Sequence, residues 1–243
     1  MNEKRPITFS LFFLRLVSGI LGGSAGTLAA FVIYFIMLSF VPTGDENTSI
    51  SVFVIILMAF VGTLVANIVT TLLVSFMDSL KYNRGKTMVT HVFIFNMILF
   101  VLSVPLYVIG ASVGILMPIV ALHFLLSAFV TALVMEVIAG GTYALLGVYS
   151  ATVAIFITIV MAFVFITVSD SELLITLAAM PMVWFMLQLI GGLAELLYDT
   201  FVTLYGVDFL STETDYGDKQ EDSEKEMEQE EKEEEDEGGE HME

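Results

Sequence analysis

Four polar side chains fall near the middle of long apolar segments, where a polar group costs free energy unless it finds a partner. These residues are Asn67, Asn96, His123 and Gln188. Amides and an imidazole at one depth can bind a polar solute, a cation or a proton inside a water-filled cavity. They can also hydrogen-bond to one another and fix helix register, each bond contributing about 0.6–2 kcal/mol. The residue types slightly favour packing and leave both interpretations open.

A second polar set, which carries ionisable groups, lies toward one end of the same segments. It contains Arg15 and the carboxylates of Asp78, Glu136 and Glu195. At about 100° per residue, the polar residues of each segment share one helix face, and facing stripes would form a polar seam. Such a seam either lines a cavity open to the cytoplasm or holds inter-helix ion pairs, for example between Arg15 and a carboxylate. The candidate seam residues are Asn67, Asn96, His123, Gln188, Asp78, Glu136 and Glu195.

The residue patterns that metal sites and enzymes require are weak or missing from the sequence. It has no cysteine, and His123 and Glu136 are 13 positions apart. That spacing puts them on different faces of one helix, so we expect no metal ion and no other cofactor. The segment Gly22–Gly26 matches the G-x-S-x-G pattern of serine hydrolases, with Ser24 as its nucleophile. That pattern requires a strand–turn–helix context, whereas this segment lies in an apolar helix, so we expect no enzyme activity.

The elements that must position these residues are long apolar segments. Hydrophobic residues make up 57% of the chain, which is too apolar for a soluble domain of this length. A helix needs about 20 apolar residues to cross a bilayer, and six segments qualify: Ile7–Val41, Ile50–Leu80, Met88–Ile109, Val113–Ala139, Thr142–Val168 and Leu173–Leu197. Short polar clusters, Gly110 and the pair Gly140–Gly141 separate them, and short connections make neighbouring helices antiparallel. The sequence therefore predicts an all-α, polytopic membrane protein, a six-transmembrane-helix bundle with short loops and a disordered acidic C-terminal tail.

The distribution of basic residues predicts the orientation in the membrane. All Lys and Arg residues before the tail lie near the start or after the second segment: Lys4, Arg5, Arg15, Lys81, Arg84 and Lys86. An even number of spans separates the two places, and the positive-inside rule assigns that side to the cytoplasm. The opposite connections contain acidic residues and no base. We therefore expect an integral protein of the plasma membrane with both termini in the cytoplasm.

The first apolar segment is longer than one span needs. At 1.5 Å per residue, a helix over residues 7–41 would extend about 52 Å. Either residues 7–18 lie in the membrane interface with Arg15 reaching the headgroups, or the helix is strongly tilted. A cleaved signal peptide is a less favoured third interpretation. We assign residues 1–19 to a cytoplasmic or interfacial segment, 20–198 to the six-helix transmembrane domain, 199–210 to an interfacial segment and 211–243 to the tail.

The tail differs from the rest of the chain in charge. Residues 211–243 hold 17 acids and three lysines, a net charge of −14 out of −18 for the whole chain. A segment with so little apolar content cannot fold alone, so its default role is to stay solvated. It could also hold a basic protein partner or cations. Nucleic acid would be repelled, and we expect none as a partner.

Small residues recur every four positions in the first segment, at Gly22, Gly26 and Ala30, and again in the fifth, at Gly147 and Ala151. Small-xxx-small rows let two helix backbones approach closely in lipid. The favoured interpretation is packing within this bundle, and the alternative is docking of a partner protein along the first helix.

These patterns indicate two classes of function. The first, which we favour, is a non-enzymatic membrane subunit or scaffold in the lipid bilayer, whose small-residue rows and acidic tail contact partners. The alternative is a small transporter, channel or solute-binding membrane component, in which the polar seam binds a small polar solute or cation. An intramembrane enzyme has no supporting constellation of residues.

Overall fold

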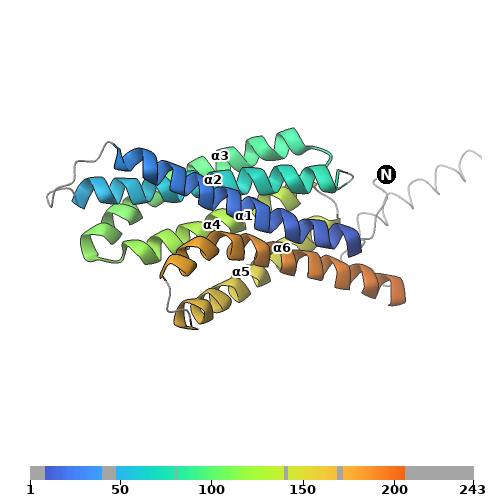
Figure 1. Cartoon of the computed structure of the whole chain (residues 1–243). Helices are drawn as coiled ribbons and strands as arrows, with labels where there is room; N and C mark the ends of the chain where they lie inside the picture. The colour runs from blue at the N-terminus through green and yellow to red at the C-terminus, as the bar shows by residue number, and fades with distance from the viewer. Residues whose placement is uncertain (1–8, 40–47, 80, 140–141, 169–171, 206–243) are drawn as a thin grey trace, which may run out of the picture. The chain divides into compact units, whose positions relative to one another are not determined.

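The chain folds into six long α-helices. The computed structural model describes residues 9–39, 48–79, 81–139, 142–168 and 172–205, and this part of the chain contains no strand. Every helix is long and apolar enough to cross a membrane. This confirms the predicted all-helical class and the six apolar helices, which suggest an integral membrane protein. The helices, shown in Figure 1, are α1 Phe9–Leu38, α2 Thr48–Met77, α3 Gly85–Val113, α4 Leu116–Ala139, α5 Thr142–Val168 and α6 Glu172–Tyr205.

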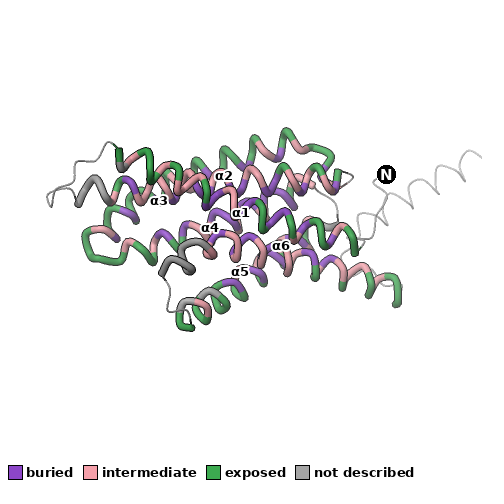
Figure 2. The backbone as a smooth tube through the Cα atoms, viewed as in Figure 1, coloured by how far each residue is buried: buried purple, intermediate pink, exposed green. Residues whose placement is uncertain are grey.

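The even-numbered helices form the inside of the bundle. α2, α4 and α6 all contact one another, while α1 packs across α2 and α6, α3 across α2 and α4, and α5 across α4 and α6. In the most apolar stretch of α2, α4 and α6, 33% of residues are buried, against 28%, 22% and 24% in α1, α3 and α5. The outward faces are apolar and exposed (Figure 2), as contact with lipid tails requires. The topology therefore brings polar residues of the three inner helices together.

The first helix is continuous across the boundary expected between residues 19 and 20. It contains 30 residues, which corresponds to about 45 Å of length. Arg15 is only 4% exposed and pairs with acids inside the bundle, which agrees with the predicted inter-helix ion pair and not with the alternative in which its side chain reaches the headgroups. Residues 199–205 continue α6. Residues 1–8, the remainder of the predicted interfacial segment and the acidic tail lie outside the described residues.

Two rows of small residues on α1 allow it to pack closely against α2 and α6. A Cβ atom at Gly22 would lie 1.9 Å from the hydroxyl of Thr70, and one at Gly26 would lie 2.5 Å from the carbonyl oxygen of Gly62. Both glycines therefore face α2, and the methyl group of Ala30 extends the row against Gly62. This is the close approach that small-xxx-small rows permit.

The other row of α1 faces α6. A Cβ atom at Gly19 would lie 2.7 Å from the carbonyl oxygen of Trp184, and one at Gly23 would lie 2.5 Å from Cα of Pro181. Because both rows pack within the bundle, the faces of α1 that carry small residues are already covered by α2 and α6.

The turn between α3 and α4 lies further along the chain than the sequence indicates. The predicted break at Gly110 is wrong: α3 continues to Val113, and the chain turns at Gly114, whose φ of 76° is left-handed. Glycine adopts this conformation without a Cβ clash, and Ile115 N–H then donates to the carbonyl of Gly110 at 2.8 Å. Gly110 leaves room for Ile119, whose Cδ1 would lie 2.3 Å from an added Cβ.

Candidate functional site

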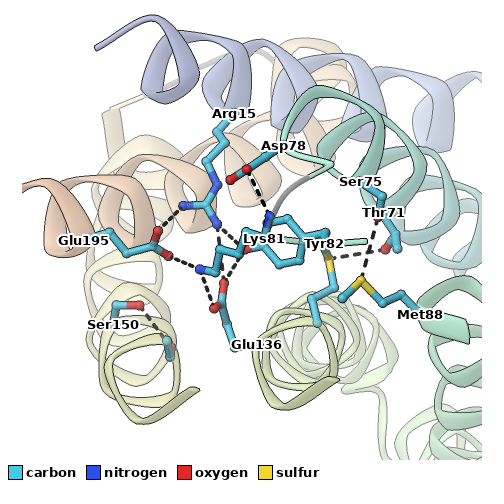
Figure 3. A network of polar contacts seen from close by, with 12 residues as sticks. Arg15, Thr71, Ser75, Asp78, Lys81, Tyr82, Met88, Glu136, Ser150 and Glu195 are labelled. Carbon is cyan, nitrogen blue, oxygen red and sulfur yellow. Dashed lines mark hydrogen bonds and ion pairs between the residues drawn. The ribbon is translucent and has the colours of Figure 1, made fainter. Parts of the chain in front are cut away.

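A closed ring of four charged side chains lies inside the bundle, at the end where α2 connects to α3 (Figure 3). Arg15 Nη1 lies 2.9 Å from Glu195 Oε2, and Arg15 Nη2 lies 3.4 Å from Glu136 Oε1. Lys81 Nζ lies 2.7 Å from Glu136 Oε2 and 2.6 Å from Glu195 Oε1. Each carboxylate therefore bridges both cations. We call Arg15, Lys81, Glu136 and Glu195 the ion ring; its formal net charge is zero.

The ion ring joins four parts of the chain that are distant in sequence. Arg15 comes from α1, Glu136 from the last turn of α4, and Glu195 from α6. Lys81 comes from the connection between α2 and α3. Within this connection, Tyr82 N–H donates to the carbonyl of Asp78 at 3.0 Å. The four side chains are 5–15% exposed. At this burial, the loss of one partner leaves a charge that is costly to keep unpaired.

Tyr82 supports the ion ring through its hydroxyl group. The hydroxyl donates to Glu136 Oε1 at 2.6 Å and accepts a hydrogen bond from Arg15 Nη2. Burial raises the pKa of Tyr82 above its usual range despite the opposing effect of Arg15, so the phenol keeps the proton that it donates. Arg15 and Lys81 also lie 5.5 Å and 5.0 Å from the centre of the tyrosine ring, within the range of cation–π attraction.

Lys81 stays charged because its neighbours are acidic. Burial alone lowers the pKa of Lys81, but Glu136, followed by Tyr82 and Glu195, raises it by more, so the net pKa lies above the usual value. Asp78 lies beside the ion ring, where its carboxylate accepts from the backbone N–H of Lys81 at 3.4 Å. Asp78 therefore helps to hold the turn that delivers Lys81.

A second, uncharged network lies deeper in the bundle. Asn67 Nδ2 donates to Asn96 Oδ1 at 2.8 Å and to Ser127 Oγ at 2.7 Å, and Asn67 Oδ1 accepts from Trp184 Nε1 at 3.0 Å. Asn96 Nδ2 donates to Thr131 Oγ1 at 3.1 Å and to the backbone of its own helix. We call Asn67, Asn96, Ser127, Thr131 and Trp184 the amide layer. It links α2, α3, α4 and α6, and both amide groups of its asparagines are hydrogen-bonded to protein.

His123 lies apart from both networks. Its ring nitrogens lie 3.4 Å from Thr63 Oγ1 and 3.3 Å from Ser103 Oγ, and its ring packs beside Tyr107 at 5.7 Å between centres. Only 3% of the residue is exposed. The structure therefore packs His123 between hydroxyl groups and an aromatic ring, whereas the seam interpretation places it in water.

Gln188 lies beside the ion ring, one helical turn from Trp184 of the amide layer. It lines a cavity of about 30 Å³ together with Arg15 and Glu136. The small residues of α5 border the same cavity, where Ala151 is buried and Gly147 faces Glu136. A Cβ atom at Gly147 would lie 2.3 Å from Glu136 Cγ, so glycine at this position makes room for a carboxylate of the ion ring.

Apart from Arg15, the list of candidate seam residues omits five residues of these networks. Two of them, Lys81 and Tyr82, belong to the connection between α2 and α3. The other three belong to the amide layer: Ser127, Thr131 and Trp184. Charge balance contains a usable signal for Lys81. Asp78, Glu136 and Glu195 lie at one end of the spans with Arg15 as the single nearby cation within them, so a second cation must come from an adjacent connection.

Comparisons with known proteins provide no assignment. Neither the family models, nor the curated proteins, nor the solved structures contain a match to this chain. Within the described ranges, no group of three or more His, Cys, Asp or Glu side chains is arranged to hold a metal ion. The geometry of the ion ring and the amide layer is therefore the main guide to function.

Proposed function

We propose that the protein is a non-enzymatic membrane subunit or scaffold, in which buried polar residues fix the arrangement of the helices. The observation that carries this proposal is the bonding of Asn67, whose amide nitrogen and oxygen both bind side chains of other helices. A solute site needs polar groups that exchange protein partners for solute. The amide layer instead uses its groups to join four helices, a role in which such bonds fix register.

The ion ring supports the same proposal. Its four charges come from α1, the α2–α3 connection, α4 and α6, and each side chain has partners of opposite charge. Two buried networks at different depths restrict the sliding and rotation of the helices. A subunit that presents a constant surface to partners benefits from such a fixed core.

We propose further that the protein lies in the plasma membrane with the ion ring at its cytoplasmic end. Arg84 and Lys86 are exposed at the start of α3, at the same end of the bundle as Arg15, which agrees with the positive-inside rule. Cysteine at the exposed position Asn83 tests this orientation. Asn83→Cys should react with a membrane-impermeant thiol reagent only after the cells are permeabilised, and reaction in intact cells would reverse the orientation.

In this proposal, the acidic tail and the outward face of α1 contact the partner. The small-residue rows of α1 face α2 and α6, whereas Leu21 and Leu28 on the opposite face are exposed. The tail carries 17 acids and three lysines, so we propose a partner with a basic surface on the cytoplasmic side.

Gentle extraction from the native membrane tests the scaffold proposal. We expect the full chain to co-purify with a partner in a fixed molar ratio. A variant that ends at Leu210 should still fold and purify in high yield, but without that partner. Thermal unfolding of the shortened variant provides the control for folding. A full chain that purifies alone and carries ions across liposome membranes would contradict the proposal.

A carrier of protons or small ions is the second candidate. It is favoured by the cavity of about 30 Å³ next to Arg15, Glu136 and Gln188, because that volume suits a water-sized species. Liposomes that contain the purified protein and a pH-sensitive dye distinguish the two functions. Proton, Na⁺ or K⁺ flux that depends on Glu136 would favour the carrier, and flux equal to that of empty liposomes would favour the scaffold.

A further inference from the structure

The cavity beside the ion ring has the size of one small molecule. Its volume of about 30 Å³ is lined by residues of α1, α4, α5 and α6 and by Tyr82 of the connection between α2 and α3. A buried water needs about 10–15 Å³ of accessible space and two to four polar partners. Arg15, Glu136, Ser150 and Gln188 are the polar side chains of spanning helices that line it.

Arg15 has a hydrogen-bond donor for which the described part of the chain offers no acceptor. Its Nη1 atom lies beside Glu195, and its Nη2 atom bonds to Tyr82 and Glu136. Its Nε atom is buried and has no hydrogen-bond partner among the described residues. A buried N–H group without an acceptor is unfavourable, so an acceptor from outside the chain would stabilise the arrangement.

The charge of the surroundings selects the kind of ligand. The charged side chains that line the cavity are one cation, Arg15, and one carboxylate, Glu136, so a bound anion or cation would add an uncompensated charge to this lining. A neutral ligand adds none. The hydroxyl of Ser150 already donates to the carbonyl of Gly147 at 3.0 Å, which leaves its oxygen able to accept from a ligand that also donates.

We propose that this cavity is a binding site for a single water molecule, which accepts a hydrogen bond from Arg15 Nε and connects the ion ring to Ser150 and Gln188. Water is neutral, fits the volume, and both accepts and donates. Gln188, which is not part of the amide layer, thereby gains a role as a polar residue of α6 that lines the water site. The inference rests on the cavity and the unpartnered donor and does not depend on the scaffold function.

Hydroxyl-radical labelling of the full chain in lipid nanodiscs tests the site directly. Radicals formed from a bound water oxidise the side chains next to it, and methionine reacts to give the sulfoxide. Met135 lines the cavity, while Met180 lies outside it and has the same exposure of 4%. We expect Met135 to be oxidised several-fold faster than Met180, and equal rates would overturn the proposal.

Filling the cavity provides the second measurement. A Cβ atom at Gly191 would meet only Ser150 Oγ, at an ordinary distance of 3.9 Å, so Gly191→Ala adds a methyl group at the cavity wall without a clash. In a dry cavity this change raises the melting temperature, because alanine favours helix more than glycine does. If the new methyl group of Gly191→Ala displaces a bound water, we expect the melting temperature to fall by about 2–6 °C. We also expect the oxidation rate of Met135 to fall to that of Met180.

The remaining outcomes also decide the proposal. A melting temperature of Gly191→Ala equal to or above that of the parent protein would show a dry cavity and overturn it. A parent protein whose melting temperature changes when chloride is replaced by a bulky anion at constant ionic strength would assign the site to a halide and overturn the assignment to water. Stability that is independent of the anion, together with fast Met135 oxidation, would support water.

Discussion

The ion ring and the amide layer solve the same problem with different chemistry. Both place polar groups between helices in a protein whose outer surface is apolar. The amide layer uses neutral groups, whose net contribution per bond between membrane helices is about 0.6–2 kcal/mol. The ion ring uses full charges, for which removal of one partner typically costs about 3–5 kcal/mol when the other stays buried. The comparison shows that similar burial does not imply similar sensitivity to substitution.

The two regions also differ in their surroundings. The amide layer is closed, and the hydrogen bonds of Asn67 and Asn96 all go to protein groups. The ion ring borders a cavity, and its Arg15 Nε has no hydrogen-bond partner in the part of the chain that the structure describes. It also depends on the α2–α3 connection for Lys81. The ion ring is therefore the region whose stability we expect to respond to water, ions or pH.

The largest expected effect comes from removing a cation of the ion ring. Arg15→Leu leaves Glu136 and Glu195 with Lys81 as the remaining charge partner within the ring, so we expect a loss of about 3–5 kcal/mol in the free energy of unfolding. Chemical unfolding in mild detergent measures it. Val17→Leu changes an exposed residue of the same helix and should stay within about 0.5 kcal/mol. An Arg15 variant as stable as this control would remove the basis for the comparison.

Crowding the ion ring should have an intermediate effect. In Gly147→Ala the new methyl group would lie 2.3 Å from Glu136 Cγ, which forces Glu136 away from its cations, and we expect a loss of about 1–3 kcal/mol. The same unfolding measurement applies. Leu145→Ala, at an exposed position of the same helix, serves as the control. A stabilised Gly147→Ala variant would show that Glu136 does not occupy this position.

A smaller effect is expected in the amide layer. Asn67→Leu removes the acceptor of Trp184 Nε1 and one donor to Asn96, and we expect a loss of about 1–2 kcal/mol. Tryptophan fluorescence reports on the same change, because Trp184 is the single tryptophan of the chain and its indole N–H loses a bond at 3.0 Å. A loss as large as that of Arg15→Leu would mean that the two regions do not differ in kind.

The smallest effect is expected at His123. Thr63 Oγ1 and Ser103 Oγ also donate to backbone carbonyls of their own helices, at 2.9 Å and 2.7 Å, so both hydroxyls keep a partner in His123→Leu. We expect a change below about 1 kcal/mol in unfolding free energy. A single cysteine in His123→Cys should also be unreactive toward water-soluble thiol reagents, because this position is buried. Rapid reaction would show that water reaches it.

Much of the fold could be predicted from sequence because lipid imposes a simple rule on composition. Segments of about 20 apolar residues must be helices, since every backbone group needs an internal partner. The positions of the breaks are less predictable. At the end of α3, both Gly110 and Gly114 could have ended the helix, and in the structure the chain turns at Gly114 while Ile119 packs against Gly110.

The polar networks could be predicted only in part, because a sequence indicates depth better than rotation about the helix axis. The sequence predicts a carboxylate as one possible partner of Arg15, and the structure pairs Arg15 with Glu136 and Glu195. Gln188 shares its predicted depth with Asn67 yet lies at the cavity of the ion ring. Lys81 belongs to a connection, which leaves no periodic pattern in the sequence, so only the charge balance of the neighbouring spans points to it.

A double-mutant cycle between Arg15 and Glu195 tests most directly whether buried polar residues pair across the helices. Arg15→Leu and Glu195→Leu should each destabilise the protein, and the double variant should lose less than the sum, because it removes a cation and an anion together. We expect a coupling energy of about 1–3 kcal/mol from unfolding in lipid nanodiscs. Losses that add to within about 0.5 kcal/mol would mean that the two side chains do not interact, and would contradict the account.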